Sequence, residues 1–244
     1  MDAARVETEL SMLAWIDQLF ANPQLLRMGH LQRAEDRNLG LGWMYYALAR
    51  ILRPSTVVVI GSWRGFTPLV FCKSLGDNLE GGRVVFVDPS LVDDFWKDPE
   101  SVRRHFLSFG VDNIEHFRMT TQEFIKTEEY RGLSDAGIVF VDGYHSEEQA
   151  EFDFEAFAPR LAPQGIVLFH DSIRVRNSTF YGADREYEHR VCCLIDRLRL
   201  RSDLQVFDMP FASGVTLVRR AEIEPAPKPG RQSGSTGDAA GPAP

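Results

Sequence analysis

A continuously apolar segment that runs straight into a glycine-containing turn is the feature that most restricts how this chain can fold. Residues 56–60 read Thr-Val-Val-Val-Ile, and residues 61–65 read Gly-Ser-Trp-Arg-Gly. β-Branched side chains favour strands, and a run that is apolar at consecutive positions favours a strand covered on both of its faces. Such strands belong to parallel sheets with helices on each side, so the segment predicts an α/β fold.

The same pattern recurs along the chain. Further short apolar runs alternate with segments of helical periodicity, and they lie at residues 83–87, 114–119, 137–141 and 165–169. Strands that alternate with helices predict right-handed βαβ units in a doubly wound sheet. Residues 204–208 and 214–220 flank a short loop with Pro210 and Gly214. This arrangement predicts a hairpin, and hence one antiparallel strand on an otherwise parallel sheet.

Three segments differ in pattern and composition. Apolar residues at helical spacing predict helices within residues 1–53, which we expect to pack on the core as an N-terminal extension. Residues 54–220 carry the strand–helix pattern of the core domain, with a last helix expected near 186–200. Residues 221–244 are rich in Pro, Gly, Ala and Ser, which predicts a disordered tail.

Composition narrows the partners of the chain. The formal net charge is −8, whereas a nucleic-acid surface needs clustered Lys and Arg, so no nucleic-acid partner is expected. No apolar run approaches the roughly 18 residues of a transmembrane helix, and the polar N-terminal residues lack the order of a signal peptide. We therefore expect no membrane partner and a cytoplasmic location. Four arginines form either a local basic patch or a solvated face: Arg174, Arg176, Arg185 and Arg190.

The turn at 61–65 favours a particular kind of ligand. Ligands of open α/β sheets bind beyond the carboxyl ends of the strands. Trp63 stands where a dinucleotide site needs a glycine for close approach of the pyrophosphate, and no Lys-Ser/Thr pair follows as in a P-loop. Asp88 ends the second apolar run, where an acid accepts hydrogen bonds from ribose hydroxyls. The pattern favours a cofactor with an adenosine and no phosphates; the alternative is a turn that only starts a helix.

Three segments together resemble a known family. Residues 57–71, 84–90 and 140–172 are similar to class I S-adenosylmethionine-dependent methyltransferases, in the small-molecule O-methyltransferase branch related to macrocin O-methyltransferase and cephalosporin hydroxylase. The most specific elements are Asp-Gly-x-His at 142–145 and His-Asp at 170–171. The resemblance implies a Rossmann-like seven-stranded sheet in the order 3-2-1-4-5-7-6 with strand 7 antiparallel.

The resemblance implies that S-adenosylmethionine is the cofactor. Asp88 is then the ribose-binding acid. The family usually has Glu or Asp two residues before the first glycine, where it holds the amino acid end of the cofactor, and this chain has Val59 there. The other cofactor-binding residues that we predict follow the first, third and fourth strands: Gly61, Ser62, Trp63, Gly65, Thr121 and Asp142.

His145 and Asp142 are the predicted catalytic residues. The fourth strand lies beside the first in this topology, so Asp142 should face the same crevice as the glycine turn. His145 precedes Ser146, the expected N-cap of the next helix, and the positive end of a helix lowers the pKa of an imidazole. A neutral imidazole suits a general base that takes the proton of an attacking hydroxyl. The alternative for His145 is a capping or surface role.

Asp142, His170 and Asp171 are candidate ligands for Mg²⁺ or another divalent ion. Related metal-dependent O-methyltransferases hold their ion at the corresponding strand ends. His170 stands where the family usually has Glu or Asp, and Mg²⁺ prefers oxygen ligands. The alternative is a metal-free site in which Asp171 orients the substrate or bonds His145.

The predicted function is methylation of a hydroxyl group on a small molecule, by an enzyme that is a monomer or a homo-oligomer. One alternative is a catalytically silent cofactor-binding or regulatory protein, which Val59 would permit. Another is an enzyme similar to the cephalosporin hydroxylase set. The polar segment 174–185 is predicted to be a substrate loop or an ordinary exposed loop, and Trp96 either covers the adenosine pocket or docks its own loop.

Overall fold

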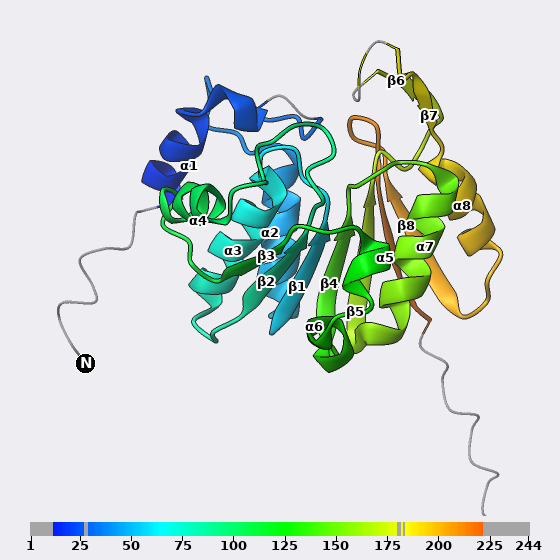
Figure 1. Ribbon diagram of the computed structural model, residues 1–244. Helices are drawn as coiled ribbons and strands as arrows, with labels where there is room; N and C mark the ends of the chain where they lie inside the picture. Colours follow the sequence, from blue (N-terminus) through cyan, green and yellow to red (C-terminus); the bar gives the residue numbers. More distant parts are fainter. Residues whose placement is uncertain (1–11, 27–28, 180–181, 183, 222–244) are drawn as a thin grey trace, which may run out of the picture.

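The computed structural model describes residues 12–26, 29–179, 182 and 184–221 of the 244. Its centre is a seven-stranded sheet in the order β3-β2-β1-β4-β5-β9-β8, drawn in Figure 1. The strands are β1 (Thr56–Ile60), β2 (Arg83–Val87), β3 (Ile114–Phe117), β4 (Ala136–Val141), β5 (Leu161–His170), β8 (Leu204–Met209) and β9 (Val215–Arg220). Only β9 runs antiparallel to its neighbours β5 and β8. The predicted sheet order is therefore confirmed.

Helices cover both faces of the sheet (Figure 1). On one side lie α1 (Met12–Phe20), α2 (Leu41–Leu52), α3 (Phe66–Asn78) and α4 (Pro99–Leu107). On the other lie α5 (Thr121–Phe124), α6 (Glu128–Gly132), α7 (Glu147–Phe157) and α8 (Val191–Arg199). Two short 3₁₀ turns are η2 (Pro23–Leu26) and η3 (Ala158–Arg160).

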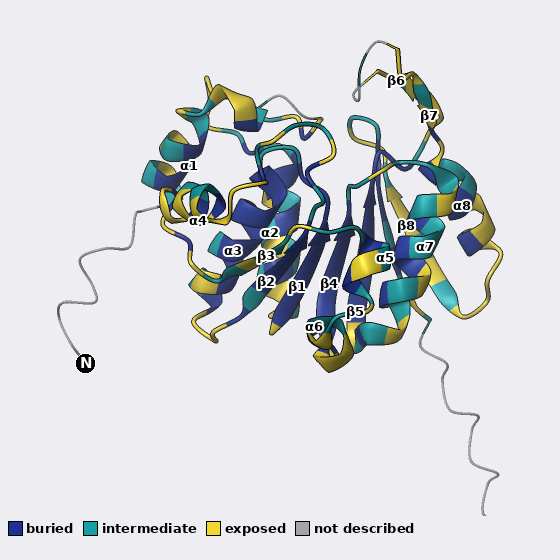
Figure 2. Ribbon diagram, viewed as in Figure 1, coloured by how far each residue is buried: buried dark blue, intermediate teal, exposed yellow. Residues whose placement is uncertain are grey.

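The side chains of successive strand residues point alternately to the two faces of the sheet. Val57 and Val59 belong to the apolar cluster under α1–α4, whereas Val58 and Ile60 belong to the cluster under α5–α8. This follows from the period of two in a strand, and it explains why the central strands are apolar at every position. Figure 2 shows these strands buried and the outer helix surfaces exposed.

The N-terminal helices share the core of the sheet. Trp15 of α1 and Tyr45 of α2 are buried in the same apolar cluster as the first strand. The Trp15 indole also donates a hydrogen bond to the carbonyl of Phe109, 3.2 Å away. The structure describes the extension predicted for residues 1–53 from residue 12 onward, apart from residues 27–28.

The segment after β5 differs from expectation. The helix expected near 186–200 begins only at Val191, and residues 187–189 instead form a strand, β7 (Tyr187–His189). It pairs with β6 (Arg176–Ser178) in a separate two-stranded antiparallel sheet. Pairing with β6 supplies partners for residues 187–189 outside a helix, and the side chain of His189 is buried.

Two further expectations concern the C-terminal tail and membrane-spanning helices. The tail predicted for 221–244 lies outside the described residues from 222 onward. Within the described residues, no helix is both long enough and apolar enough to span a membrane.

Candidate active site

A cavity of about 390 Å³ opens at the carboxyl ends of β1, β2, β4 and β5. It is the place where the strand order reverses, at which open α/β sheets bind their ligands. Of the predicted site residues, Gly65 does not line it; it starts α3 with a φ of 86° and packs beneath Trp96. The predicted residues that do line the cavity are Gly61, Ser62, Trp63, Asp88, Thr121, Asp142, His145, His170 and Asp171.

Gly61 brings the turn against the end of β4. Its φ is 73°, and a Cβ at this position would lie 2.4 Å from the carbonyl oxygen of Asp142. Its N–H donates to the carbonyl of Val87 at 2.9 Å. Because only glycine combines this backbone angle with such a close approach, the turn, β2 and β4 meet at one point.

Asp88 lies at the end of β2 beside that turn. Its carboxyl accepts hydrogen bonds from the backbone N–H of Ser62 (3.1 Å) and of Ser90 (2.7 Å). Burial raises the pKa of Asp88 to about 6, although both hydrogen bonds act in the opposite direction. Trp96 donates its indole N–H to the carbonyl of Ser62 at 3.1 Å, so it docks its loop onto the turn as well as lining the cavity.

A chain of polar side chains closes the cavity beside α5. Gln122 donates to Gln149 (2.8 Å), and Gln149 donates to Asp153 (2.9 Å). Burial raises the pKa of Asp153 to about 6, against hydrogen bonds that include the one from the buried Thr121. Asp153 was not among the predicted site residues, because on sequence it is one polar position within the helix α7.

Asp142 and Asp171 lie on either side of His145. The Nε2 of His145 is 3.6 Å from an oxygen of Asp142 and 3.9 Å from an oxygen of Asp171. The Nδ1 of His170 is 2.9 Å from Asp142 and 3.7 Å from Asp171. The ends of β4 and β5 therefore bring together the predicted base and all three predicted metal ligands.

Two further histidines that we did not predict complete this group. The Nδ1 of His189, on β7, is 3.3 Å from Asp171, and its ring stacks on that of His145 at 4.3 Å between centroids. The Nε2 of His30, in the loop before α2, is 4.0 Å from Asp142. Neither histidine has a local sequence signal, since each comes from a segment far from the strand ends. We call the set of His30, Asp142, His145, His170, Asp171 and His189 the His/Asp cluster.

Burial favours the neutral form of some histidines in the cluster, whereas the two carboxylates favour the charged form of another. Burial lowers the pKa of His145 to about 4 and that of His30 to about 3, so both rings are neutral at pH 7. Burial also acts to lower the pKa of His170, but Asp142 and Asp171 outweigh it and raise that pKa to about 9. The prediction of a neutral His145 thus holds, with burial as the main cause.

Asp171 is held unusually firmly. Its side chain is 3% exposed, and its backbone has a φ of 54°, a left-handed conformation that few residues other than glycine adopt. The guanidinium of Arg176, on β6, donates to one of its oxygens. Burial would raise the pKa of Asp171, but the His189 ring 3.3 Å away and the positive charges around it hold that pKa well below its usual range.

The donor set of the cluster fits a magnesium ion poorly. Two groups of side chains place their ligand atoms within 4.8 Å of one another: Asp142 with His145 and His170, and Asp171 with His145 and His189. Each group offers two nitrogens and one carboxylate, whereas Mg²⁺ takes oxygen ligands in an octahedron.

The sheet order and its flanking helices match the Rossmann-like fold of methyltransferases. A model of a family described as methyltransferase domain matches residues 58–172. This segment holds the glycine turn, Asp88 and the whole 142–171 region, and its similarity to that family agrees with the sequence resemblance.

Similar proteins agree on the fold. The O-methyltransferase of Bacillus cereus in complex with S-adenosylhomocysteine has a TM-score of 0.62 at 12% identity, over 89% of this chain and 94% of that chain. TomG of Streptomyces achromogenes, an O-methyltransferase of tomaymycin synthesis in complex with S-adenosylmethionine, has a TM-score of 0.56 at 17% identity, over 89% and 93%.

A curated relative is similar in sequence over part of its length. The uncharacterized protein y4gI of Sinorhizobium fredii is 26% identical over 133 residues, which make up 53% of this chain. The match covers 14% of the relative, so this chain corresponds to a small portion of that protein.

Proposed function

We propose that the protein is an S-adenosylmethionine-dependent methyltransferase that methylates a hydroxyl group of a small molecule, with His145 as the general base. The observation that carries the proposal is a neutral, mostly buried His145 whose Nε2 lies within 4 Å of two carboxylates, in the same cavity as the glycine turn and Asp88. The solved O-methyltransferases of the same fold support this class of reaction.

The cofactor would occupy the cavity between the glycine turn and the end of β2. Asp88 supplies carboxylate oxygens for the two ribose hydroxyls, in the position that nucleotide-binding Rossmann folds use. Thr121 and Gln122 line the cavity at the start of α5, where they can meet the adenine edge. Val59 is fully buried in the apolar core, so the amino acid end of the cofactor must bind to other groups, and Asp142, whose backbone lies against Gly61, is a candidate acid.

Methyl transfer needs one proton to leave the substrate. The substrate oxygen forms a bond to the methyl carbon while the bond from that carbon to sulfur breaks and its electron pair goes to sulfur, which yields S-adenosylhomocysteine. The hydroxyl proton passes to the Nε2 of His145, and the carboxylates of Asp142 and Asp171 stabilise the imidazolium that forms. A positioned base contributes about 10²–10⁴-fold, and orientation of the reactants contributes much of the rest.

Cofactor binding and turnover, measured together, distinguish the proposed enzyme from a catalytically silent cofactor-binding protein. We expect calorimetry to detect S-adenosylmethionine and S-adenosylhomocysteine binding to the protein. His145→Ala should keep that affinity within about threefold and lower the single-turnover rate of methyl transfer by about 10²–10⁴-fold, because only the proton acceptor is lost. Absence of cofactor binding at millimolar concentration would refute the proposal, and loss of affinity in His145→Ala would reassign His145 to the cofactor pocket.

A further inference from the structure

Both carboxylates of the His/Asp cluster lie close to nitrogen atoms of the chain. One oxygen of Asp171 accepts from the Arg176 guanidinium and lies 3.3 Å from the Nδ1 of His189. Asp142 lies 2.9 Å from the Nδ1 of His170. Neither imidazole nitrogen makes a well-oriented hydrogen bond there, whereas the guanidinium does. A guanidinium has no lone pair for a metal ion, so Arg176 occupies an oxygen of Asp171 that a metal ion would use.

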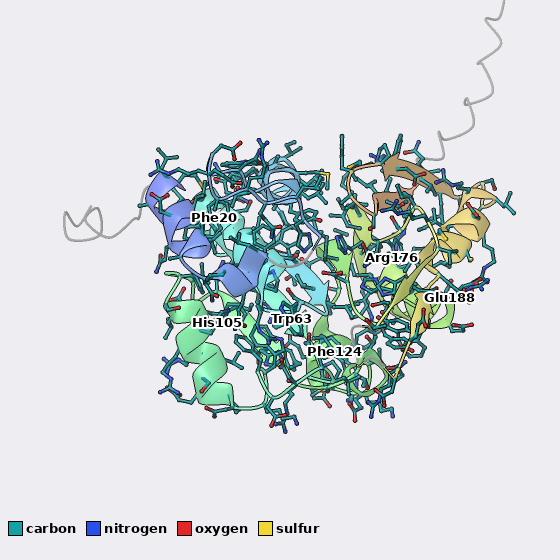
Figure 3. All side chains as sticks on the ribbon, turned by 90° about the horizontal axis from the view of Figure 1, so that it is seen from above. Phe20, Trp63, His105, Phe124, Arg176 and Glu188 are labelled. Carbon is teal, nitrogen blue, oxygen red and sulfur yellow. The ribbon has the colours of Figure 1, made fainter. Side chains whose placement is uncertain are left out.

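The β6–β7 hairpin delivers Arg176 to this place. Arg176 and His189 are directly opposite each other in the ladder, so their side chains lie on the same face of the hairpin, and both reach Asp171. The backbone N–H of Arg190 donates to the carbonyl of His145 at 2.8 Å, which ties the end of β7 to the turn after β4. In Figure 3, Arg176 lies nearer the middle of the molecule than Glu188, its neighbour in the hairpin.

The positive charge of Arg176 compensates the carboxylate of Asp171, as a bound cation would. A carboxylate as buried as that of Asp171 is costly unless a positive group compensates it. A guanidinium keeps its charge at every physiological pH, and that of Arg176, whose side chain is 42% exposed, reaches a carboxylate that is 3% exposed. Asp171 in turn faces the Nε2 of His145, so Arg176 acts on the predicted base through Asp171.

We propose that Arg176 takes the place of a divalent metal ion beside Asp171, so that Arg176 is a positioning residue for Asp171. The part of this inference that concerns catalysis rests on the proposed methyl transfer. The part that concerns metal binding does not, since it depends only on the contacts of the cluster.

The test is a gain of metal binding when Arg176 is neutralised. Purified, chelator-treated protein is titrated with Mn²⁺ by calorimetry, and bound Mn²⁺ is counted by electron paramagnetic resonance. We expect the wild type to bind no stoichiometric Mn²⁺ tighter than a Kd of about 1 mM, and Arg176→Gln to bind one ion at least about tenfold more tightly. Arg174→Gln, an exposed arginine of the same segment, should behave as the wild type.

Arg176→Lys separates the effect of charge from damage to the hairpin. Lysine keeps the positive charge, so this variant should exclude Mn²⁺ as the wild type does, whereas general disruption would affect both substitutions alike. The proposal is wrong if the wild type binds one Mn²⁺ with micromolar affinity, if Arg176→Gln binds no ion, or if Arg176→Lys gains binding equal to that of Arg176→Gln.

A second measurement on the same samples keeps the two proposals distinguishable. S-adenosylhomocysteine affinity of the wild type is measured with and without EDTA. Binding that EDTA leaves unchanged agrees with the metal-free site, and a loss of affinity of tenfold or more on adding EDTA would contradict it. Absence of S-adenosylhomocysteine binding under both conditions would refute the methyltransferase proposal, while the Mn²⁺ titrations would still decide the role of Arg176.

Discussion

Single residues in the cavity take their protonation from burial more than from their place in the sequence. Asp88 and His145 illustrate this at the two ends of the proposed cofactor site: burial raises the pKa of the carboxyl and lowers that of the imidazole. Both shifts favour the neutral form, as removal of water does for any ionisable group. The lowered pKa of His145 keeps the imidazole neutral, as a general base requires. The raised pKa of Asp88 disfavours the ionised carboxylate, which is the form that ribose hydroxyls bind best.

The raised pKa of Asp88 predicts a pH dependence of cofactor affinity. Ribose hydroxyls donate to the carboxylate, so protonation of Asp88 below a pH of about 6 should weaken S-adenosylhomocysteine binding, by at most about tenfold per pH unit. Calorimetry between pH 5 and pH 8 measures the profile. Asp88→Asn should bind weakly at every pH, with a flatter profile. Equal pH dependence in the two proteins would assign the titration to another group.

At the scale of secondary structure elements, helix starts and turns place the site residues. The side chain of Ser146 accepts a hydrogen bond from the N–H of Gln149 at 3.1 Å and so begins α7 directly after His145. The capping box of Thr120 and Glu123 begins α5 in the same way beside Thr121. The Ser146 cap was predicted from the sequence, because a cap depends on only four consecutive positions.

Ser146→Ala should lower the free energy of unfolding by about 1 kcal/mol, because the N–H of Gln149 loses its acceptor. Ser146→Asp should restore most of this stability, since aspartate caps helices equally well. Denaturant unfolding of the three proteins measures the difference. Thr127→Ala, which removes the cap of α6, is a matched control: we expect a similar loss of stability with unchanged S-adenosylhomocysteine affinity. Equal stability of Ser146→Ala and the wild type would contradict the capping role.

At the scale of the whole molecule, the sheet topology concentrates buried charge at one edge. The ends of β4 and β5, the loop before α2 and the β6–β7 hairpin all meet at the His/Asp cluster. Asp142 and Asp171 together raise the pKa of His170 to about 9 although burial acts to lower it. Folding thus stabilises the imidazolium form of His170, which links the stability of the whole fold to pH.

The stability of the protein should fall between pH 6.5 and pH 9. An unfolded histidine has a pKa of about 6.5, so the contribution of charged His170 is complete below that pH and is lost as the pH rises through about 9. We expect a loss on the order of 1–3 kcal/mol, measured by urea unfolding across this range. His170→Gln should show a flatter profile in the same window. A wild-type profile as flat as that of the variant would contradict the assignment.

The sequence by itself determined the sheet and most of the residues at its carboxyl edge. Runs such as 56–60 are β-branched and almost entirely apolar, and that pattern favours a strand covered on both faces. The glycine turn, Asp88 and Asp142 each directly follow such a run, so their place at the edge needs no knowledge of the rest of the molecule.

Only the tertiary structure decided which other side chains contact the predicted site residues. His30 and His189 come from a loop and a small hairpin whose path over the sheet has no periodic signal, and Arg176 was one of four arginines with equal claims on sequence. Their contacts with Asp142 and Asp171 depend on side chains that are distant along the chain and meet in a buried space. Burial, charge pairing and therefore protonation are properties of that space, which is why no local pattern could contain them.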